Sequence, residues 1–197
     1  MSFVAWVGLG EVTIAASFLF PTLLMVNAIA NGWEPVVQYL VVVAGGAAQG
    51  FLVAFVWWAL LARAGVTAPL LVWLAYLSAG TALSWAVAQI PGFLPRDTIA
   101  TTITLVEVAT VVVALGLPMI AQWVVLRRIT PRAVVFAWIS FAAWLAGAAI
   151  MVGTLSVLTS VTDLKSTIAL LVLGAFAAVF AVAIGTWYAA VRLLRKR

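Results

Sequence analysis

Short breaks divide the chain into six long apolar runs, and this pattern constrains the fold more than any other feature. A transmembrane helix needs about 20 mostly apolar residues, whereas a membrane β-strand shows alternating residues over about ten. The continuous runs therefore predict an all-α integral membrane protein, a bundle of six transmembrane helices. The approximate limits of the runs are Phe3–Ala28, Pro35–Arg63, Pro69–Gln89, Thr98–Arg127, Pro131–Leu158 and Ser166–Leu194.

The breaks between the runs are rich in turn-forming residues. Pro35, Pro69 and Pro131 each stand at the beginning of a run, where a helix tolerates a missing N–H. Asp97 and Ser166 are predicted to cap the fourth and sixth helices. Every connection is too short for a soluble domain, so all 197 residues are expected to form a single transmembrane domain.

The composition narrows the classes of function. Hydrophobic residues make up 67% of the chain and charged residues only 8%, against about 25% charged in soluble domains. This excludes a soluble protein and a nucleic-acid-binding domain. The chain has no cysteine and no histidine, so it cannot form a disulfide, a thiolate or imidazole metal site, or a Ser–His or Cys–His catalytic pair. We expect no cofactor and no catalytic activity of its own.

The charged residues predict the orientation of the helices. Basic residues in short loops mark the cytoplasmic side of a membrane protein. On this basis both termini lie in the cytoplasm, in the inner (plasma) membrane of a cell. The arginines are interpreted as topological signals, with binding of anionic lipid as the alternative. One side carries Arg63, Arg127, Arg128, Arg132, Arg192, Arg195, Lys196 and Arg197, and the other carries only Arg96 and Lys165 beside Glu34, Asp97 and Asp163.

A Trp-x-x-x-x-Arg pattern closes the second, fourth and sixth runs. It begins at Trp58, Trp123 and Trp187, at spacings of 65 and 64 residues. One interpretation is a helical hairpin of about 65 residues that is repeated three times. The other is that tryptophan and arginine each prefer the membrane interface. Both interpretations give three antiparallel hairpins that leave from and return to the cytoplasm.

Glu107 is an ionisable residue inside a predicted span, which makes it a functional candidate by default. Thr101, Thr104 and Thr110 flank it at intervals of three residues, and the four are predicted to lie near one face. Such a polar stripe is expected to face the bundle interior or a wet cavity. Glu107 then either binds a ligand or couples to protons, or it joins its helix to a neighbour through a structural hydrogen bond.

Two further polar features lie in the first and second runs. Glu11 follows Trp6 closely, so it is expected near the interface, either paired with an arginine or in a functional role. Gln49 belongs to a polar stripe on the second run. Gly46 and Gly50 form a Gly-x-x-x-Gly motif, which permits close helix packing inside the bundle or between two copies.

Prolines interrupt the two runs that hold the glutamates. Pro21 and Pro118 lie inside the first and fourth runs, where proline kinks a helix and frees a backbone carbonyl. This pattern indicates either a site between the first and fourth helices or a simple irregularity of packing.

Most of the ten tryptophans lie near predicted helix ends, as an interfacial belt requires. Gln122 is likewise expected at the interface. Trp85 and Trp144 lie deeper and are interpreted as core or lipid contacts, or as the lining of a cavity. The tryptophans assigned to the belt are Trp6, Trp33, Trp57, Trp58, Trp73, Trp123, Trp138 and Trp187.

Together these features predict a multi-pass protein that binds or transports a small molecule. The alternative is a structural or accessory subunit of a larger membrane complex, and an intramembrane enzyme has the least support. Expected partners are the lipid bilayer, a small-molecule ligand, and membrane proteins or a second copy. The residues predicted to bind a ligand or couple to protons are Glu107, Glu11, Thr104, Thr110 and Gln49.

Overall fold

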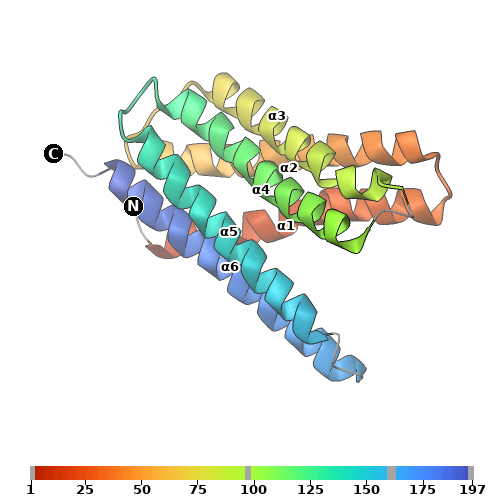
Figure 1. Cartoon of the computed structure of the whole chain (residues 1–197). Helices are drawn as coiled ribbons and strands as arrows, with labels where there is room; N and C mark the ends of the chain where they lie inside the picture. Colours follow the sequence, from red (N-terminus) through yellow and green to blue (C-terminus); the bar gives the residue numbers. More distant parts are fainter. Residues whose placement is uncertain (1–2, 96–98, 159–162, 195–197) are drawn as a thin grey trace.

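The structure is a computed structural model that describes residues 3–95, 99–158 and 163–194. In these ranges the chain forms helices without any strand (Figure 1). The helices agree with the six apolar runs to within two residues at each end. They are α1 (Phe3–Ala30), α2 (Pro35–Arg63), α3 (Leu70–Ala88), the short 3-10 helix η1 (Ile90–Phe93), α4 (Ala100–Leu126), α5 (Ala133–Leu158) and α6 (Leu164–Leu194).

Five helical stretches are long and apolar enough to cross a membrane. They lie in α2, in α3 with η1, and in α4, α5 and α6. At most 39% of the residues in the most apolar part of any of them are buried inside the chain, so large apolar side chains point outward. A soluble protein rarely exposes so much contiguous apolar surface. The chain is therefore a helical, membrane-embedded type of protein.

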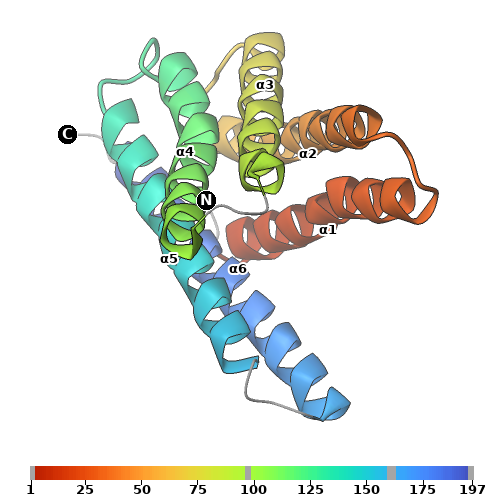
Figure 2. The ribbon, with the colours of Figure 1, turned by 45° about the vertical axis from the view of Figure 1, so that its right-hand side comes forward.

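The six α-helices pack as a ring in chain order. Each helix contacts the next one, and α6 returns to contact α1. The most extensive contacts join α5 to α6, α2 to α3 and α1 to α2, whereas the contacts of α4 with α5 and of α1 with α6 are smaller. Figures 1 and 2 show the result: the α5–α6 hairpin diverges from the other four helices toward its loop end.

Glycines permit close approach at several of these contacts. A Cβ on Gly147 of α5 would lie 2.8 Å from a methyl group of Val182 and 3.1 Å from the carbonyl oxygen of Ala178, both on α6. A Cβ on Gly185 would overlap the side chain of Ala143 in the same hairpin. In lipid there is no hydrophobic driving force between helices, so close backbone contact has to hold them together. These glycines permit such contact and thereby stabilise the packing of α5 on α6.

The helix-interior prolines also lie against glycines. A Cβ on Gly45 of α2 would lie 2.9 Å from the Cα of Pro21, and one on Gly80 of α3 would lie 3.3 Å from the Cα of Pro118. Among the described residues α1 packs on α2 and α6, while α4 packs on α3, η1 and α5. The first and fourth helices share no extensive contact in the described residues, and the site between them stays a prediction.

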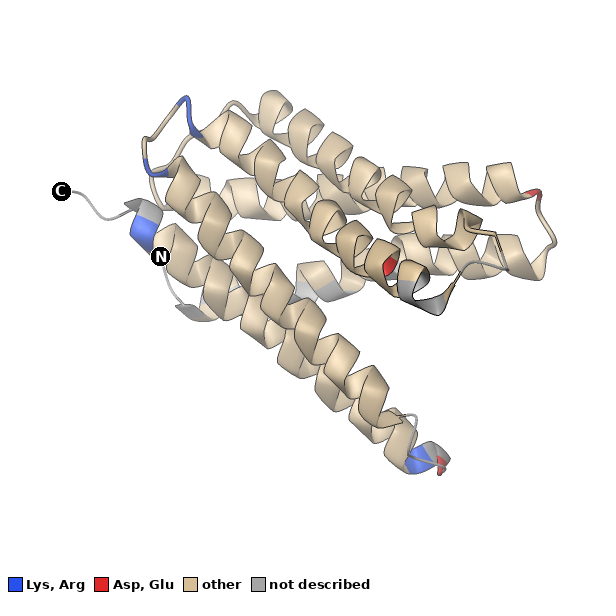
Figure 3. Ribbon diagram, viewed as in Figure 1, with Lys and Arg blue, Asp and Glu red and all other residues tan. Residues whose placement is uncertain are grey.

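Most described charges lie at the two ends of the bundle (Figure 3). We call one of these the arginine end, where α1 begins and α6 ends. The opposite end holds the loops that follow α1, α3 and α5. The described charges of the arginine end are Arg63, Arg127, Arg128, Arg132 and Arg192, and those of the opposite end are Glu34, Asp163 and Lys165.

Asp163 caps the beginning of α6. Its carboxylate accepts a hydrogen bond of 2.8 Å from the backbone N–H of Ser166. Hydrogen bonds from the side chain and the backbone of Ser166 favour the charged form and hold the pKa of Asp163 below its usual value. The prediction that Ser166 is the cap is wrong, because Ser166 lies in the first turn as the donor. The predicted cap Asp97 lies outside the described residues.

Candidate functional site

Glu107 lies seven residues into α4, about 10 Å along the helix from its first residue. Its side chain is exposed in the isolated chain. Its neighbours Val108 and Val111 are also exposed, at 58% and 43%. By its position in the sequence, Glu107 lies on the half of α4 nearer the opposite end. Glu107 is thus a single carboxyl group on an outward, apolar helix face.

The threonines around Glu107 do not share its surroundings. Thr104 is exposed and Thr110 is buried, and the side chain of Thr101 lies outside the described part. A helix turns by about 100° per residue, so each step of three falls about 60° short of a full turn. Three such steps carry the row halfway round the helix. The prediction that the whole stripe faces inward is therefore wrong for Thr104 and Glu107.

Glu11 is the other glutamate predicted to be functional. It belongs to α1, but its side chain lies outside the described part, as does its predicted pairing with an arginine. Among the described residues no three His, Cys, Asp or Glu side chains gather where they could hold a metal ion.

Gln49 lies at the contact between α2 and α3 and is only 4% exposed. Its side-chain oxygen Oε1 accepts a hydrogen bond of 2.6 Å from the indole N–H of Trp85 on α3. Gly46 lies beside the same ring, and a Cβ there would overlap it. A Cβ on Gly50 would lie 2.8 Å from the carbonyl oxygen of Leu77 on α3. Gln49 and the glycine motif of α2 thus meet one helix of the same chain, α3.

Trp85 also belongs to an aromatic cluster that joins three helices. The ring of Phe18 on α1 lies 6.2 Å from Trp85 and 6.3 Å from Trp144 on α5. We call these three residues the aromatic cluster. The indole nitrogen of Trp144 is buried and has no hydrogen-bond acceptor among the described residues. The cluster therefore contains one unused donor at a three-helix junction.

Three tryptophans predicted for the interfacial belt instead form the core near the arginine end. Trp6, Trp57 and Trp73 are each at most 1% exposed. Trp6 stacks on Trp57 at 6.0 Å and donates to the hydroxyl oxygen of Thr186 at 3.3 Å. Trp73 donates to the carbonyl oxygen of Ala54 at 2.8 Å. The belt prediction is wrong for these three, because their rings turn inward, and the indole N–H groups of Trp6 and Trp73 find acceptors within the bundle.

Further polar groups are buried in the same region. Gln122 is 2% exposed and Ser140 is fully buried, so both side chains face the interior of the bundle. The amide oxygen of Gln122 and the hydroxyl of Ser140 have no hydrogen-bond partner among the described residues. Ser140 and Thr186 belong to no motif, and a lone hydroxyl inside an apolar run is the only signal that marks them.

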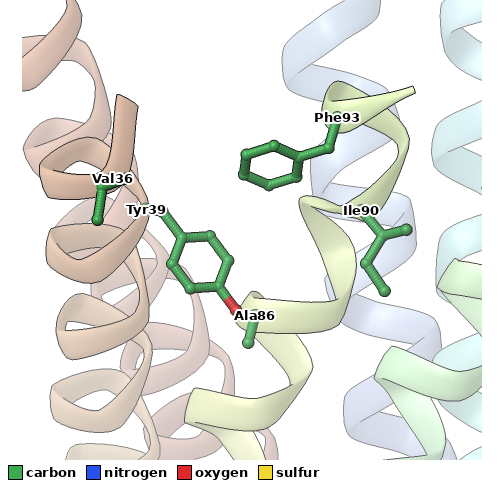
Figure 4. A pocket seen from close by; sticks show the side chains of 5 residues that line it. All are labelled: Val36, Tyr39, Ala86, Ile90 and Phe93. Atoms are coloured by element: carbon green, nitrogen blue, oxygen red, sulfur yellow. The ribbon is translucent and has the colours of Figure 1, made fainter. Parts of the chain in front are cut away.

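The described residues line two of the pockets on the surface of the bundle. The first, near the opposite end, has a volume of about 270 Å³ and is lined by Tyr39 of α2, Phe93 of η1 and their neighbours (Figure 4). The rings of Tyr39 and Phe93 meet edge to face at 5.9 Å. The second, of about 380 Å³, lies between α4 and α5 and includes Trp123 and Trp138. Glu107 and Gln49 line neither pocket.

The predicted site residues therefore separate into different environments. Gln49 is engaged inside the bundle, Thr110 is buried, and Glu107 and Thr104 are exposed on the outer side of α4. Such an arrangement can bind a polar group that approaches α4 from outside the chain. The chain matches no protein-family model, no curated protein and no solved structure.

Proposed function

We propose that the chain is a six-span inner-membrane protein, organised as one domain, with the arginine end in the cytoplasm. The proposal is supported by the gathering of described arginines where α1 begins and α6 ends, since basic loops stay on the cytoplasmic side. It counts α1 as a span on its 28-residue length. The proposal keeps the threefold hairpin repeat as the origin of this layout.

Within this membrane, we propose that the chain acts as a subunit of a larger assembly and has no catalytic activity of its own. The observation that carries the proposal is the exposure of Glu107 on an apolar face of α4. A charged side chain within a span costs about 2.5–3.5 kcal/mol at the bilayer centre on insertion scales and less toward the helix end where Glu107 lies, so it is found against protein or water. A helix of a partner or of a second copy, with a polar group opposite Glu107, would remove this cost.

The shape of the bundle supports the same proposal. The α5–α6 hairpin diverges from the other helices toward its loop end (Figure 1), and on the half of α4 that carries Glu107 the side chains of Val108 and Val113 are 58% and 50% exposed. The outward residues there are mostly valine and leucine, among them Leu105 at 70% exposure. A neighbouring helix can pack on this face while it satisfies the carboxyl group.

The test is to extract the protein in a mild detergent and measure its assembly by size exclusion with light scattering. We expect a particle larger than one chain, and we expect Glu107→Leu to shift it toward the single chain. An interhelical hydrogen bond contributes about 0.6–2 kcal/mol, which corresponds to about a 3- to 30-fold weaker association. Glu107→Gln keeps an acceptor and should fall between the two.

Glu34→Gln serves as the matched control, because Glu34 is an exposed glutamate in the α1–α2 connection. It should leave the assembly unchanged. A wild-type protein that elutes as a single chain without partners would refute the subunit function, as would an unaltered assembly in Glu107→Leu.

A second candidate function, binding or transport of a small molecule, is favoured by the aromatic cluster. The unused indole N–H of Trp144 beside Phe18 offers one donor and two ring faces to a flat ligand. Uptake of riboflavin, whose flat ring system carries carbonyl acceptors, into proteoliposomes tests it. Trp144→Phe should reduce uptake, and uptake that equals that of empty liposomes would exclude this function for that class of ligand.

A further inference from the structure

The pocket between α4 and α5 is a surface groove near the arginine end. Its lining is apolar throughout and includes Met119, Ile120 and Trp123 from α4 and Ala137, Trp138 and Phe141 from α5. Ile120 and Trp138 are 56% and 66% exposed, so the groove opens to the outside of the bundle. In a membrane-embedded chain this outside is lipid, and the occupant must therefore present an apolar surface.

Positive charge lies at the end of this groove. The guanidinium group of Arg127 lies over the ring of Trp123, 4.7 Å from its centre. Arg128 and Arg132 follow in the same short connection, which contains no acidic residue and continues into Val134 of the groove lining. Figure 3 shows this connection between α4 and α5 as a basic segment.

We propose that this groove binds an anionic phospholipid. An acyl chain lies along the rings of Trp123, Trp138 and Phe141, and the phosphate of the headgroup binds Arg127 and its neighbouring arginines. The apolar groove matches the acyl chain, and the arginines at its end match the anionic headgroup. A membrane presents the two parts of the lipid in this same order. Arginine suits this role because its planar guanidinium group donates two parallel hydrogen bonds to phosphate. The proposal does not depend on the subunit function or on Glu107.

The test of the headgroup contact is a lipid titration followed by native mass spectrometry of the detergent-purified protein. The probes are phosphatidylglycerol and phosphatidylcholine with identical acyl chains, so they differ only in headgroup charge. We expect tighter binding of phosphatidylglycerol and about a fivefold loss for Arg127→Gln, the usual contribution of one basic residue near an anionic surface. Arg63→Gln, at the end of α2, removes the same charge elsewhere on the arginine end and should have no effect.

The test of the acyl-chain contact is to fill the groove. Gly116 lies in its lining, and a Cβ there meets only an edge atom of Phe141 at 3.8 Å, so a larger side chain fits without disturbing the helix. Gly116→Leu should weaken the binding of both lipids while the melting temperature stays close to that of the wild type. Gly153→Leu is the matched control, because a Cβ on Gly153 meets nothing within 4 Å and Gly153 lies outside this groove.

Four results would overturn the proposal. These are equal affinity for the two lipids, an equal loss in Arg63→Gln and Arg127→Gln, unchanged lipid binding in Gly116→Leu, and displacement of phosphatidylglycerol by millimolar inorganic phosphate. The last would mean that the arginines bind a free anion. If Gly116→Leu instead abolishes a dimer and leaves the bound lipid count unchanged, the occupant is a second copy and the lipid proposal fails.

Discussion

The hydrogen bond between Trp85 and Gln49 should stabilise the contact between α2 and α3 measurably. The bond is short, at 2.6 Å, and Gln49 is 4% exposed. Gln49→Leu keeps the apolar volume but removes the acceptor, which leaves the indole N–H without its partner. Such a loss costs about 1–3 kcal/mol in the interior of a soluble protein, whereas coupling energies in a membrane bundle average about 0.6 and reach about 1.7 kcal/mol. We therefore expect a loss of about 1–2 kcal/mol.

A double-mutant cycle separates the hydrogen bond from the packing of the ring. Trp85→Phe also removes ring surface that lies against Gly46 and Phe18, so alone it should cost more than Gln49→Leu. The double variant still lacks the packing of the indole ring. It contains neither the donor nor the acceptor, so no buried polar group is left unsatisfied. The coupling energy should be about 0.6–1.7 kcal/mol.

The assay is reversible unfolding by sodium dodecyl sulfate in mixed micelles, followed by circular dichroism. All four proteins of the cycle need the same helical content before unfolding. A coupling energy of zero, with both single variants folded, would refute the assignment of Gln49 as a structural partner of Trp85. It would return Gln49 to the residues predicted to bind a ligand.

Three further predictions follow from packing and capping. Gly147→Leu should destabilise the protein by about 1–3 kcal/mol in the same unfolding assay, because its side chain would collide with α6, while Gly153→Leu should be near neutral. Thr186→Val should cost about 0.6 kcal/mol there, since it removes the acceptor of the buried Trp6 N–H, and an unchanged stability would contradict that bond. Because the pKa of Asp163 is lowered in the folded protein, its cap stabilises above about pH 4 and is lost as the pH falls through that lowered pKa. The melting temperature should therefore fall less between pH 6 and pH 2 in Asp163→Asn than in the wild type.

The helices could be predicted closely because their signals are local. An apolar run, its flanking proline and a short polar break all act within a few residues of the helix end. The second run, Pro35–Arg63, coincides with α2 at both ends. The cap of α6 was predicted three residues late because both Asp163 and Ser166 are good capping residues, and only the backbone path shows which one accepts the hydrogen bond.

The candidate site could not be predicted in the same way, because position along a span indicates depth but not direction. Trp57 and Trp138 both lie near helix ends, yet Trp57 is 1% exposed and Trp138 is 66% exposed. Gln122 and Glu107 belong to the same helix, and the amide is buried while the carboxyl group is exposed. The packing of neighbouring helices decides these directions, and the sequence does not show which helices are neighbours.

From the sequence alone follow the helical, membrane-embedded character of the chain, the limits of its helices and the concentration of arginine at their ends. These properties depend on the transfer of apolar side chains out of water and on signals near each helix end. Only the tertiary structure decides that Trp85 meets Gln49, that Trp6 meets Thr186 and that Glu107 stays uncovered. The physical reason is that lipid is as apolar as a helix neighbour, so a span that is apolar all round does not reveal which side packs.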